Sequence, residues 1–184
     1  MNECVEKILI KVFRVIGKIE KSIKNIIPYS NLEIRPSTVF IKNMGRKDLV
    51  GVEIGVEHGY NTRVMLSVLP IKKIFLVDPC NLSMAKKILA PFGHKTVFIN
   101  KKSKFALDDI PDNLDFVYID GDHSYDAVKN DISLYYKKIR KGGVLCGHDF
   151  SADYLGVCKA VMKFAQSNGL TMHGANRDWW VIKK

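Results

Sequence analysis

Acidic and histidine residues follow two successive apolar runs of this sequence, in a pattern that could serve acid–base chemistry or hold a cation. Asp120, Asp122 and His123 follow the first run, and His148 and Asp149 follow the second. Neighbouring parallel strands lie about 4.8 Å apart, so their ends could bring Asp120 and Asp149 within bridging distance of a metal. Carboxylate oxygens are ligands that Mg²⁺, Ca²⁺ and Mn²⁺ prefer, and an imidazole can act as a general base near neutral pH. His123, His148 and Asp149 are therefore candidate catalytic residues, and Asp120 and Asp149 are candidate ligands of a divalent cation.

A turn with two glycines follows an earlier apolar run, residues 50–54. It reads Glu53-Ile54-Gly55-Val56-Glu57-His58-Gly59. Two glycines four residues apart permit a tight turn and let a ligand approach the bare backbone. The turn differs from the G-x-G-x-x-G pattern of dinucleotide-binding proteins, because Glu57 stands where that pattern needs a glycine. Glu53 and Glu57 would repel a pyrophosphate and would suit a ligand that carries positive charge.

Asp78 ends the next apolar run, nineteen residues after Gly59. An acidic side chain at this position of an α/β sheet can accept hydrogen bonds from both ribose hydroxyls of an adenosine. Asp followed by Pro also begins many turns, so a purely structural role for Asp78 is the alternative.

The elements that must position these residues alternate between short apolar strands and helices. We expect strands at 50–54, 73–77, 96–99, 114–119 and 144–147, and helices at 61–69, 83–90, 104–107, 124–139 and 155–167. Near-continuous apolar strands between helices are typical of a parallel sheet that is covered on both faces. Two further strands, 170–173 and 179–182, predict an antiparallel hairpin at the sheet edge. The sequence therefore predicts a doubly wound α/β fold.

The first 27 residues form a separate predicted element. Apolar residues recur at spacings of three and four over residues 3–27, and lysines fill the other side, so we expect a basic amphipathic helix. Such a helix can lie on an anionic membrane or bury its apolar stripe against a domain or a second copy, and we favour docking or a homodimer. We predict a boundary between this helix, 1–27, and a domain of residues 28–184. We also expect the helix and residues 31–46 to form part of a lid over the acceptor.

Composition excludes several classes of protein. The 184 residues suit one domain, and no apolar run reaches the roughly 18 residues that span a bilayer. The four cysteines form no CxxC pair and accompany no secretory signal, which favours a cytoplasmic protein that its basic helix could hold at the inner membrane surface. The net charge of +10 permits attraction to nucleic acid, anionic lipid or an anionic substrate.

Taken together, these motifs resemble the class I S-adenosylmethionine-dependent methyltransferases. Residues 53–59 are similar to the cofactor loop E/D-x-G-x-x-x-G of that family, and Asp78 matches its ribose-binding acid. The segments 114–125 and 141–150 resemble a branch of small O-methyltransferases related to sugar- and antibiotic-modifying enzymes. The resemblance covers about residues 49–182. It implies a Rossmann-like sheet of seven strands, the last antiparallel, and SN2 transfer of a methyl group from the sulfonium to a substrate hydroxyl.

The resemblance also implies roles for the residues of the cofactor site. Glu53, Gly55 and Gly59 would shape the methionine pocket, with Glu53 near the cationic end of S-adenosylmethionine. Asp78 would hold the ribose, and Asp120 would lie beside the methionine moiety or a metal.

The same resemblance makes His123 the preferred base and Asp149 a metal ligand or substrate anchor. The sequence departs from the family pattern in two places. Some relatives carry two acids where this chain has His148 and Asp149, which bears on whether Mg²⁺ or another divalent cation is needed. Many relatives also place an acid just before the position of Ser103, where this chain has lysines; Ser103 could still contact the adenine.

Three other functions remain open. A nucleic-acid methyltransferase fits the basic charge, but Asp120-Gly121-Asp122-His123 replaces the D/N-P-P-Y motif of base N-methylating enzymes. A nicotinamide-dependent oxidoreductase would need the missing glycine, and a non-catalytic scaffold would not need the acid and histidine residues. We therefore expect O-methylation of a small molecule or saccharide, and the lysine surplus favours an anionic acceptor such as a glycan or a lipid-linked saccharide.

Overall fold

The computed structural model describes residues 33–184. The chain divides into two compact units, Met1–Ile34 and Arg35–Lys184, and the second unit contains every element described below. The predicted helix over residues 3–27 and the predicted boundary after residue 27 lie outside the described residues. Within the described range, no helix combines the length and the apolar character that crossing a bilayer requires.

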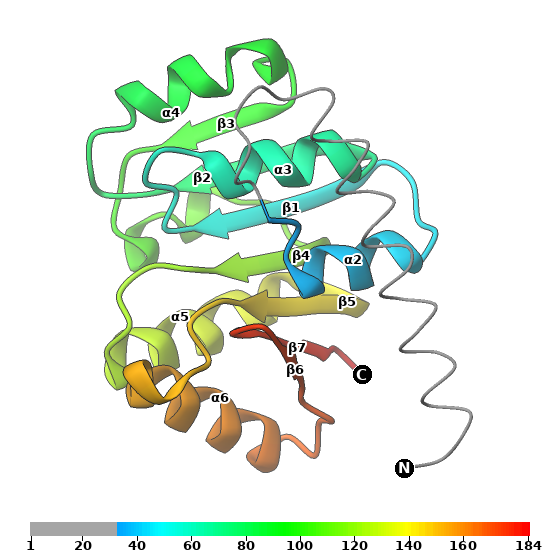
Figure 1. Cartoon of the computed structure of the whole chain (residues 1–184), viewed down its shortest axis with the longest axis vertical. Coiled ribbons are helices and arrows are strands. Elements are labelled where there is room, and N and C mark those ends of the chain that lie inside the picture. Colours follow the sequence, from blue (N-terminus) through cyan, green and yellow to red (C-terminus); the bar gives the residue numbers. More distant parts are fainter. Residues whose placement is uncertain (1–32) are drawn as a thin grey trace. The chain divides into compact units, whose positions relative to one another are not determined.

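The second unit alternates strands and helices, as the sequence predicts (Figure 1). The helices are α2 (Pro36–Asn43), α3 (Tyr60–Val68), α4 (Ser83–Ile88), α5 (Tyr125–Lys138) and α6 (Leu155–Ser167). Short 3₁₀ turns occur at η1 (Ala90–Phe92), η2 (Ser103–Phe105), η3 (Leu107–Asp109) and η4 (Ala152–Tyr154). The strands are β1 (Leu49–Ile54), β2 (Ile71–Val77), β3 (Thr96–Ile99), β4 (Leu114–Ile119), β5 (Ile139–Gly147), β6 (His173–Ala175) and β7 (Asp178–Ile182).

The seven strands form one sheet in the order β3-β2-β1-β4-β5-β7-β6. Strands β1 to β5 pair in parallel, whereas β7 is antiparallel to both β5 and β6. The strand order reverses between β1 and β4, and open α/β sheets bind their ligands at the carboxyl ends of the strands at such a point. The predicted doubly wound, mostly parallel seven-stranded sheet with a C-terminal antiparallel hairpin is confirmed.

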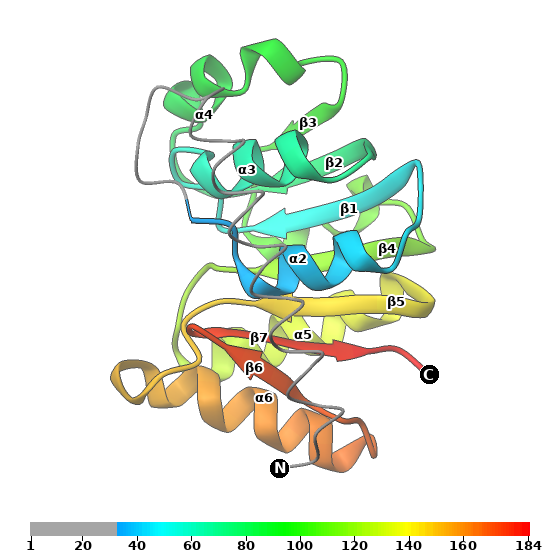
Figure 2. The ribbon, with the colours of Figure 1, turned by 45° about the vertical axis from the view of Figure 1, so that its right-hand side comes forward.

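Alternate residues of each strand face opposite layers of helices. Phe116 and Tyr118 of β4 pack in the core that α2, α3 and α4 cover, while Val117 and Ile119 pack in the core beneath α5 and α6. None of these four side chains is more than 4% exposed. Figures 1 and 2 show α2 and α3 on one side of the sheet and α5 and α6 on the other. Both faces are buried, which explains the near-continuous apolar sequence of the strands.

The acceptor lid expected at residues 31–46 stays a prediction. Within this segment, α2 packs on β5 and β7 and places Val39 and Ile41 in the core with exposures of 2% and 3%. The expected strand over residues 170–173 is wrong, because β6 begins only at His173. The Leu170 N–H instead donates to the Ala165 carbonyl oxygen and closes the end of α6.

Candidate active site

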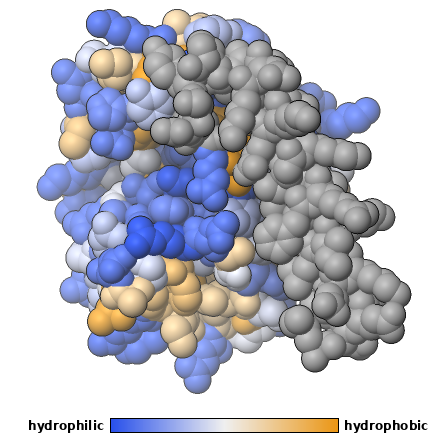
Figure 3. Space-filling view, in the orientation of Figure 1, coloured by the Kyte–Doolittle hydropathy of each residue, from blue (hydrophilic) through white to orange (hydrophobic). Residues whose placement is uncertain are grey.

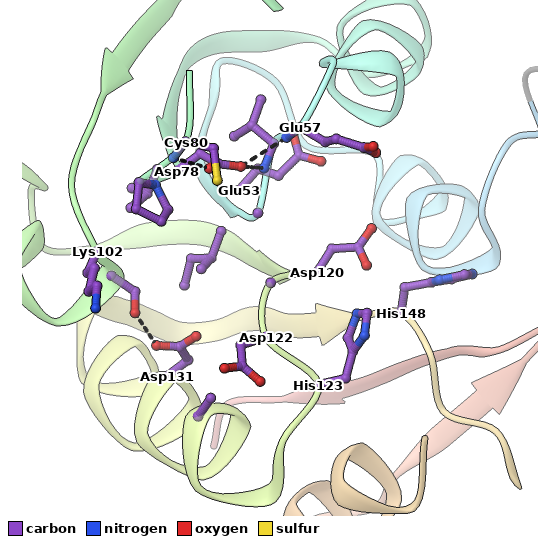
Figure 4. Close-up of a pocket in the computed structure, with 18 of the residues that line it drawn as sticks. Glu53, Glu57, Asp78, Cys80, Lys102, Asp120, Asp122, His123, Asp131 and His148 are labelled. Atoms are coloured by element: carbon purple, nitrogen blue, oxygen red, sulfur yellow. Dashed lines mark hydrogen bonds between the residues drawn. The ribbon is translucent and has the colours of Figure 1, made fainter. Parts of the chain in front are cut away.

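A cavity of about 1120 Å³ lies at the carboxyl ends of β1, β2, β4 and β5. Six acidic residues line it, and Figure 4 shows them distributed around the cavity: Glu53, Glu57, Asp78, Asp120, Asp122 and Asp131. The edge of the molecule toward which the parallel strands point, at the left of Figure 3, is mostly hydrophilic. A cavity of this size can enclose an organic cofactor together with part of a second substrate.

Gly55 brings the end of β1 against the end of β4. Its φ is 82°, and a Cβ atom there would lie 2.1 Å from the Asp120 carbonyl oxygen. No other residue type fits this crossing, since an added side chain would overlap the backbone and the left-handed conformation favours glycine. Gly59 also has positive φ, 80°, and precedes the first turn of α3. The two predicted glycines therefore shape the loop over the cavity floor.

Glu53 lies at the base of the cavity with 1% exposure. Its carboxylate accepts hydrogen bonds from Asn61 Nδ2, at 2.8 Å, and from the Thr62 hydroxyl, and both donors come from the first turn of α3. Burial raises the pKa of Glu53 to about 7, although these two donors lower it. A positively charged group entering the cavity would stabilise the ionised form of this buried carboxylate.

Replacing Glu53→Gln is expected to remove a pH dependence from the stability of the free protein. The raised pKa means that the unfolded chain releases this proton first, so the free energy of unfolding falls as pH rises from about 4.5 to about 7. One pKa unit corresponds to about 1.4 kcal/mol. Between about pH 5 and 8, the free energy of unfolding measured in urea should therefore fall by about 2–3 kcal/mol more in the wild type than in the variant. Glu57→Gln is the matched control, because the Glu57 side chain is 84% exposed, and should follow the wild type. An equal fall in the free energy of unfolding in the wild type and in Glu53→Gln would contradict the raised pKa of Glu53.

Asp78 ties the end of β2 to the glycine loop. Its Oδ2 accepts the backbone N–H groups of Val56 and Glu57 at 2.8 and 3.0 Å, and its Oδ1 accepts that of Cys80 at 2.8 Å. Burial alone would raise the pKa of Asp78, but these N–H donors stabilise the charged form and hold the pKa below its usual value. The exposed Cys80 thiol is a further, weak hydrogen-bond donor to this carboxylate. Asp78 is therefore both a turn-forming residue and a cavity residue.

The ends of β4 and β5 bring the predicted catalytic residues together. His123 Nε2 lies 3.0 Å from Asp149 Oδ2, and His148 Nδ1 lies 3.3 Å from Asp149 Oδ1. Asp149 has a φ of 59°, a conformation that few residues other than glycine adopt and that often marks functional sites. Ligand atoms of Asp120, His123 and Asp149 all lie within 4.8 Å of one another. The ring of Tyr154 packs on the His123 ring with a centroid distance of 4.4 Å.

Arg35 is a cavity residue that sequence reasoning missed. Its Nη1 donates to Tyr118 Oη at 2.6 Å and to Asp120 Oδ2 at 2.9 Å. Burial lowers the pKa of Arg35, but Tyr118 and Asp120 raise it by more, so the guanidinium stays charged. Burial likewise raises the pKa of Asp120, while Arg35 and His148 lower it. No motif marks this arginine, which precedes the proline at the start of α2 and lies 85 residues from Asp120 in sequence.

Ser103 also lines the cavity, but its hydroxyl already donates to Asp131 Oδ1 at 2.5 Å. Asp131 is a second residue that the sequence analysis missed. It is 6% exposed, and burial raises its pKa. The sequence did hold a sign of this residue. Asp131 lies on the apolar face of α5 with Val128, Ile132 and Tyr135, and a carboxylate is rarely buried there unless it is paired.

Residues 52–150, more than half of the chain, match a family model described as a methyltransferase domain. The chain belongs to this methyltransferase family. Its fold is that of the class I enzymes that use S-adenosylmethionine, as the sequence predicts. Asp78, Glu53 and the glycine loop of this methyltransferase occupy the part of the sheet where the fold binds its ligand.

A curated relative of the methyltransferase is the uncharacterised protein R132 of Acanthamoeba polyphaga mimivirus. It is 31% identical over 121 residues, which are 59% of this chain and 54% of R132, so the match spans about half the length of that relative. An O-methyltransferase from Bacillus cereus, solved with S-adenosylhomocysteine, aligns with a TM-score of 0.64 at 13% identity over 94% of this chain and 91% of its own. An rRNA methylase from Streptococcus thermophilus aligns with a TM-score of 0.63 at 16% identity over 82% and 96%. These two structures show that the methyltransferase shares their fold.

Proposed function

We propose that this methyltransferase transfers the methyl group of S-adenosylmethionine to a hydroxyl group of a small molecule or saccharide. The observation that carries the proposal is the pairing of His123 with Asp149 at 3.0 Å on the rim of an acidic cavity. An imidazole beside a carboxylate is the arrangement that takes a proton from a hydroxyl nucleophile. A neutral ring nitrogen with a free lone pair would not need such a base.

The charges around the cavity suit the cofactor. Its adenosine would lie toward Asp78, whose carboxylate can accept a ribose hydroxyl in place of the weak donor of the exposed Cys80 thiol. Its sulfonium and ammonium groups would then lie toward Glu53 and Asp120, the two buried carboxylates at the ends of β1 and β4. Opposite charges in a site of low dielectric attract one another strongly, which favours the positively charged cofactor over its neutral-sulfur product.

In the proposed reaction the acceptor oxygen attacks the methyl carbon while the carbon–sulfur bond breaks. Oxygen, carbon and sulfur must lie in line, with the reacting atoms about 3–3.5 Å apart, and the shape of the cavity supplies this alignment. His123 takes the hydroxyl proton as the new carbon–oxygen bond forms, and the Asp149 carboxylate stabilises the imidazolium that results. The products are the methylated acceptor and S-adenosylhomocysteine.

The predicted divalent cation fits these residues poorly. Asp120, His123 and Asp149 offer donor atoms within 4.8 Å of one another, but Asp120 Oδ2 already binds the Arg35 guanidinium at 2.9 Å. Asp149 lies between two imidazoles. The Arg35 guanidinium therefore already offsets part of the charge of Asp120, and it repels a divalent ion about twice as strongly as it repels a singly charged group of the cofactor. We propose transfer without a metal.

Treatment with EDTA is accordingly expected to leave the rate of methyl transfer unchanged within about twofold, because proton removal falls to His123 and no metal-bound group is needed. The measurement compares initial rates of the purified protein before and after dialysis against the chelator, and again with added Mg²⁺ or Mn²⁺. A loss of more than about tenfold that either ion restores would show that the three donor atoms hold a metal.

The test of the proposed function measures methyl transfer from S-adenosylmethionine labelled in the methyl group. Hydroxyl-bearing acceptors, namely phenols, free sugars and lipid-linked saccharides, are compared with total RNA and with acceptors that offer only amines. Label in an ether, lost when the hydroxyl is blocked, supports the proposal. Label that enters RNA bases alone would replace it with a nucleic-acid methyltransferase. A folded protein that does not bind S-adenosylhomocysteine in calorimetry would favour a non-catalytic role.

A further inference from the structure

We propose that Arg35 binds the carboxylate of the methionine moiety of S-adenosylmethionine and so makes the cavity selective for the complete amino-acid end of the cofactor. The inference rests on the proposed function and adds a positioning residue to it. It assigns a role to an arginine that the reaction described above uses only to neutralise Asp120.

The guanidinium of Arg35 is held in a fixed position. Its Nη1 donates to Tyr118 and Asp120, and the Tyr118 hydroxyl in turn donates to Asp178 Oδ1 at 2.8 Å. Asp178 also accepts the Ser37 N–H at 3.0 Å and the Ser37 hydroxyl. This chain of hydrogen bonds joins the start of α2 to β4 and β7. A side chain held in this way loses little further conformational entropy when it binds a ligand.

The guanidinium also retains unused donors. An arginine has five N–H groups, and both hydrogen bonds of Arg35 within the described part of the chain come from Nη1. The side chain keeps 24% of its surface exposed and lines the cavity. Among residues 33–184, Nε and Nη2 have no hydrogen-bond partner and can form the forked pair of hydrogen bonds that a carboxylate accepts from arginine.

The distribution of charge around the cavity points to a carboxylate as the partner. The methionine end of the cofactor carries an ammonium and a sulfonium, which suit Glu53 and Asp120, and one carboxylate, which needs a cation. Arg35 is the only arginine or lysine among the described cavity residues at the ends of β1, β4 and β5. The other two basic residues of the lining, Lys102 and Lys104, lie at η2, which follows β3.

The position along the sheet agrees with this assignment. Asp78 ends β2, and Arg35 contacts Asp120 at the end of β4, with β1 between them. The two sites are thus separated by two strand spacings, roughly 10 Å. A cofactor whose ribose lies at Asp78 has to extend its amino-acid end along the sheet edge. If that end extends toward β4, it reaches Arg35.

The experiment compares two ligands that differ only at the amino-acid end. S-adenosylhomocysteine carries the carboxylate, and 5′-methylthioadenosine has the same adenosine and sulfur without it. Calorimetric titration of Arg35→Met should show affinity for S-adenosylhomocysteine reduced by about 30-fold or more, because a charged and forked hydrogen-bond pair is lost, while affinity for methylthioadenosine changes by less than about threefold. Arg35→Lys should lie between wild type and Arg35→Met, since it keeps the charge but not the fork.

Two further variants separate this role from a general one. Lys102→Met removes a cation from the end of the cavity near η2, away from Arg35. It should leave the ratio of the affinities for S-adenosylhomocysteine and methylthioadenosine unchanged. Tyr118→Phe keeps Arg35 but loses the hydroxyl that holds it, and should weaken S-adenosylhomocysteine selectively by several-fold. Equal weakening of both ligands in Arg35→Met, or no weakening of either, would overturn the proposal. A folded wild type that binds neither ligand would overturn the proposed function itself.

Discussion

Asp78→Ala is expected to lower the affinity for S-adenosylhomocysteine by about 100- to 1000-fold. The carboxylate receives three backbone N–H groups, and two of them, from Val56 and Glu57, belong to the loop beneath the cofactor. A hydrogen bond to a charged group contributes about 1.5–3 kcal/mol, so losing the ribose contact together with part of the order of the loop corresponds to the stated range, which is about 3–4 kcal/mol. Calorimetric titration of wild type and variant measures the change directly.

The control for Asp78 is an acid outside the cavity. Asp112→Ala serves, because the Asp112 side chain is 73% exposed and pairs only at the surface, with Lys138 at 3.0 Å. It should bind S-adenosylhomocysteine like the wild type. Asp78→Asn adds a test of charge, since an amide keeps one acceptor oxygen but cannot accept all three N–H groups. If Asp78→Ala folds with normal thermal stability and binds as tightly as the wild type, the ribose end of the cofactor lies elsewhere.

His123→Ala is expected to lower kcat for methyl transfer by about 100- to 10,000-fold, the usual contribution of a positioned general base. The affinity for S-adenosylhomocysteine should remain close to that of the wild type, because His123 lies on the rim beside Asp149 and not at the ribose end. Initial rates at saturating cofactor, together with calorimetric titration, separate these two effects.

His94→Ala is the matched control for His123, since His94 is exposed and lies in the turn before β3, outside the cavity lining. It should retain wild-type rates. His148→Ala tests the other imidazole that contacts Asp149. A large loss of kcat in His148→Ala with little loss in His123→Ala would transfer the role of base to His148.

The order of elements in the fold could be predicted from the sequence because the central strands are buried on both faces. The runs at 73–77 and 114–119 contain almost no polar side chains, and such runs between helices permit few arrangements other than a covered parallel sheet. Helix α2 was not predicted, because its stretch begins Pro-Ser-Thr and shows little apolar periodicity. Its Ser37 and Thr38 are nevertheless fully buried, through contacts that only the folded chain provides.

The residues of the candidate site that belong to a sequence motif could be predicted. The residues that reach the site through partners distant in the sequence could not. Glu53, Asp78 and Asp120 each end or follow a strand, and topology places strand ends together. Arg35 belongs to no strand end, and its role arises from partners more than 80 residues away. The sequence could suggest metal ligands but could not show that a guanidinium already binds Asp120. Long-range pairing of this kind depends on side-chain geometry that spacing does not encode.

The carboxylate of Asp178 also sets an order of assembly. Residues from α2, β4 and β7 meet there, and β7 lies between β5 and β6 in the sheet. A ribosome delivers β1 to β5 first, and domains begin to fold from the N-terminal side during synthesis. Until translation passes Asp178, the Tyr118 hydroxyl lacks its acceptor and the support of Arg35 is incomplete. A nascent chain can therefore contain the whole glycine loop while Arg35 still lacks its support, and we expect full affinity for the cofactor only when the last strand joins the sheet.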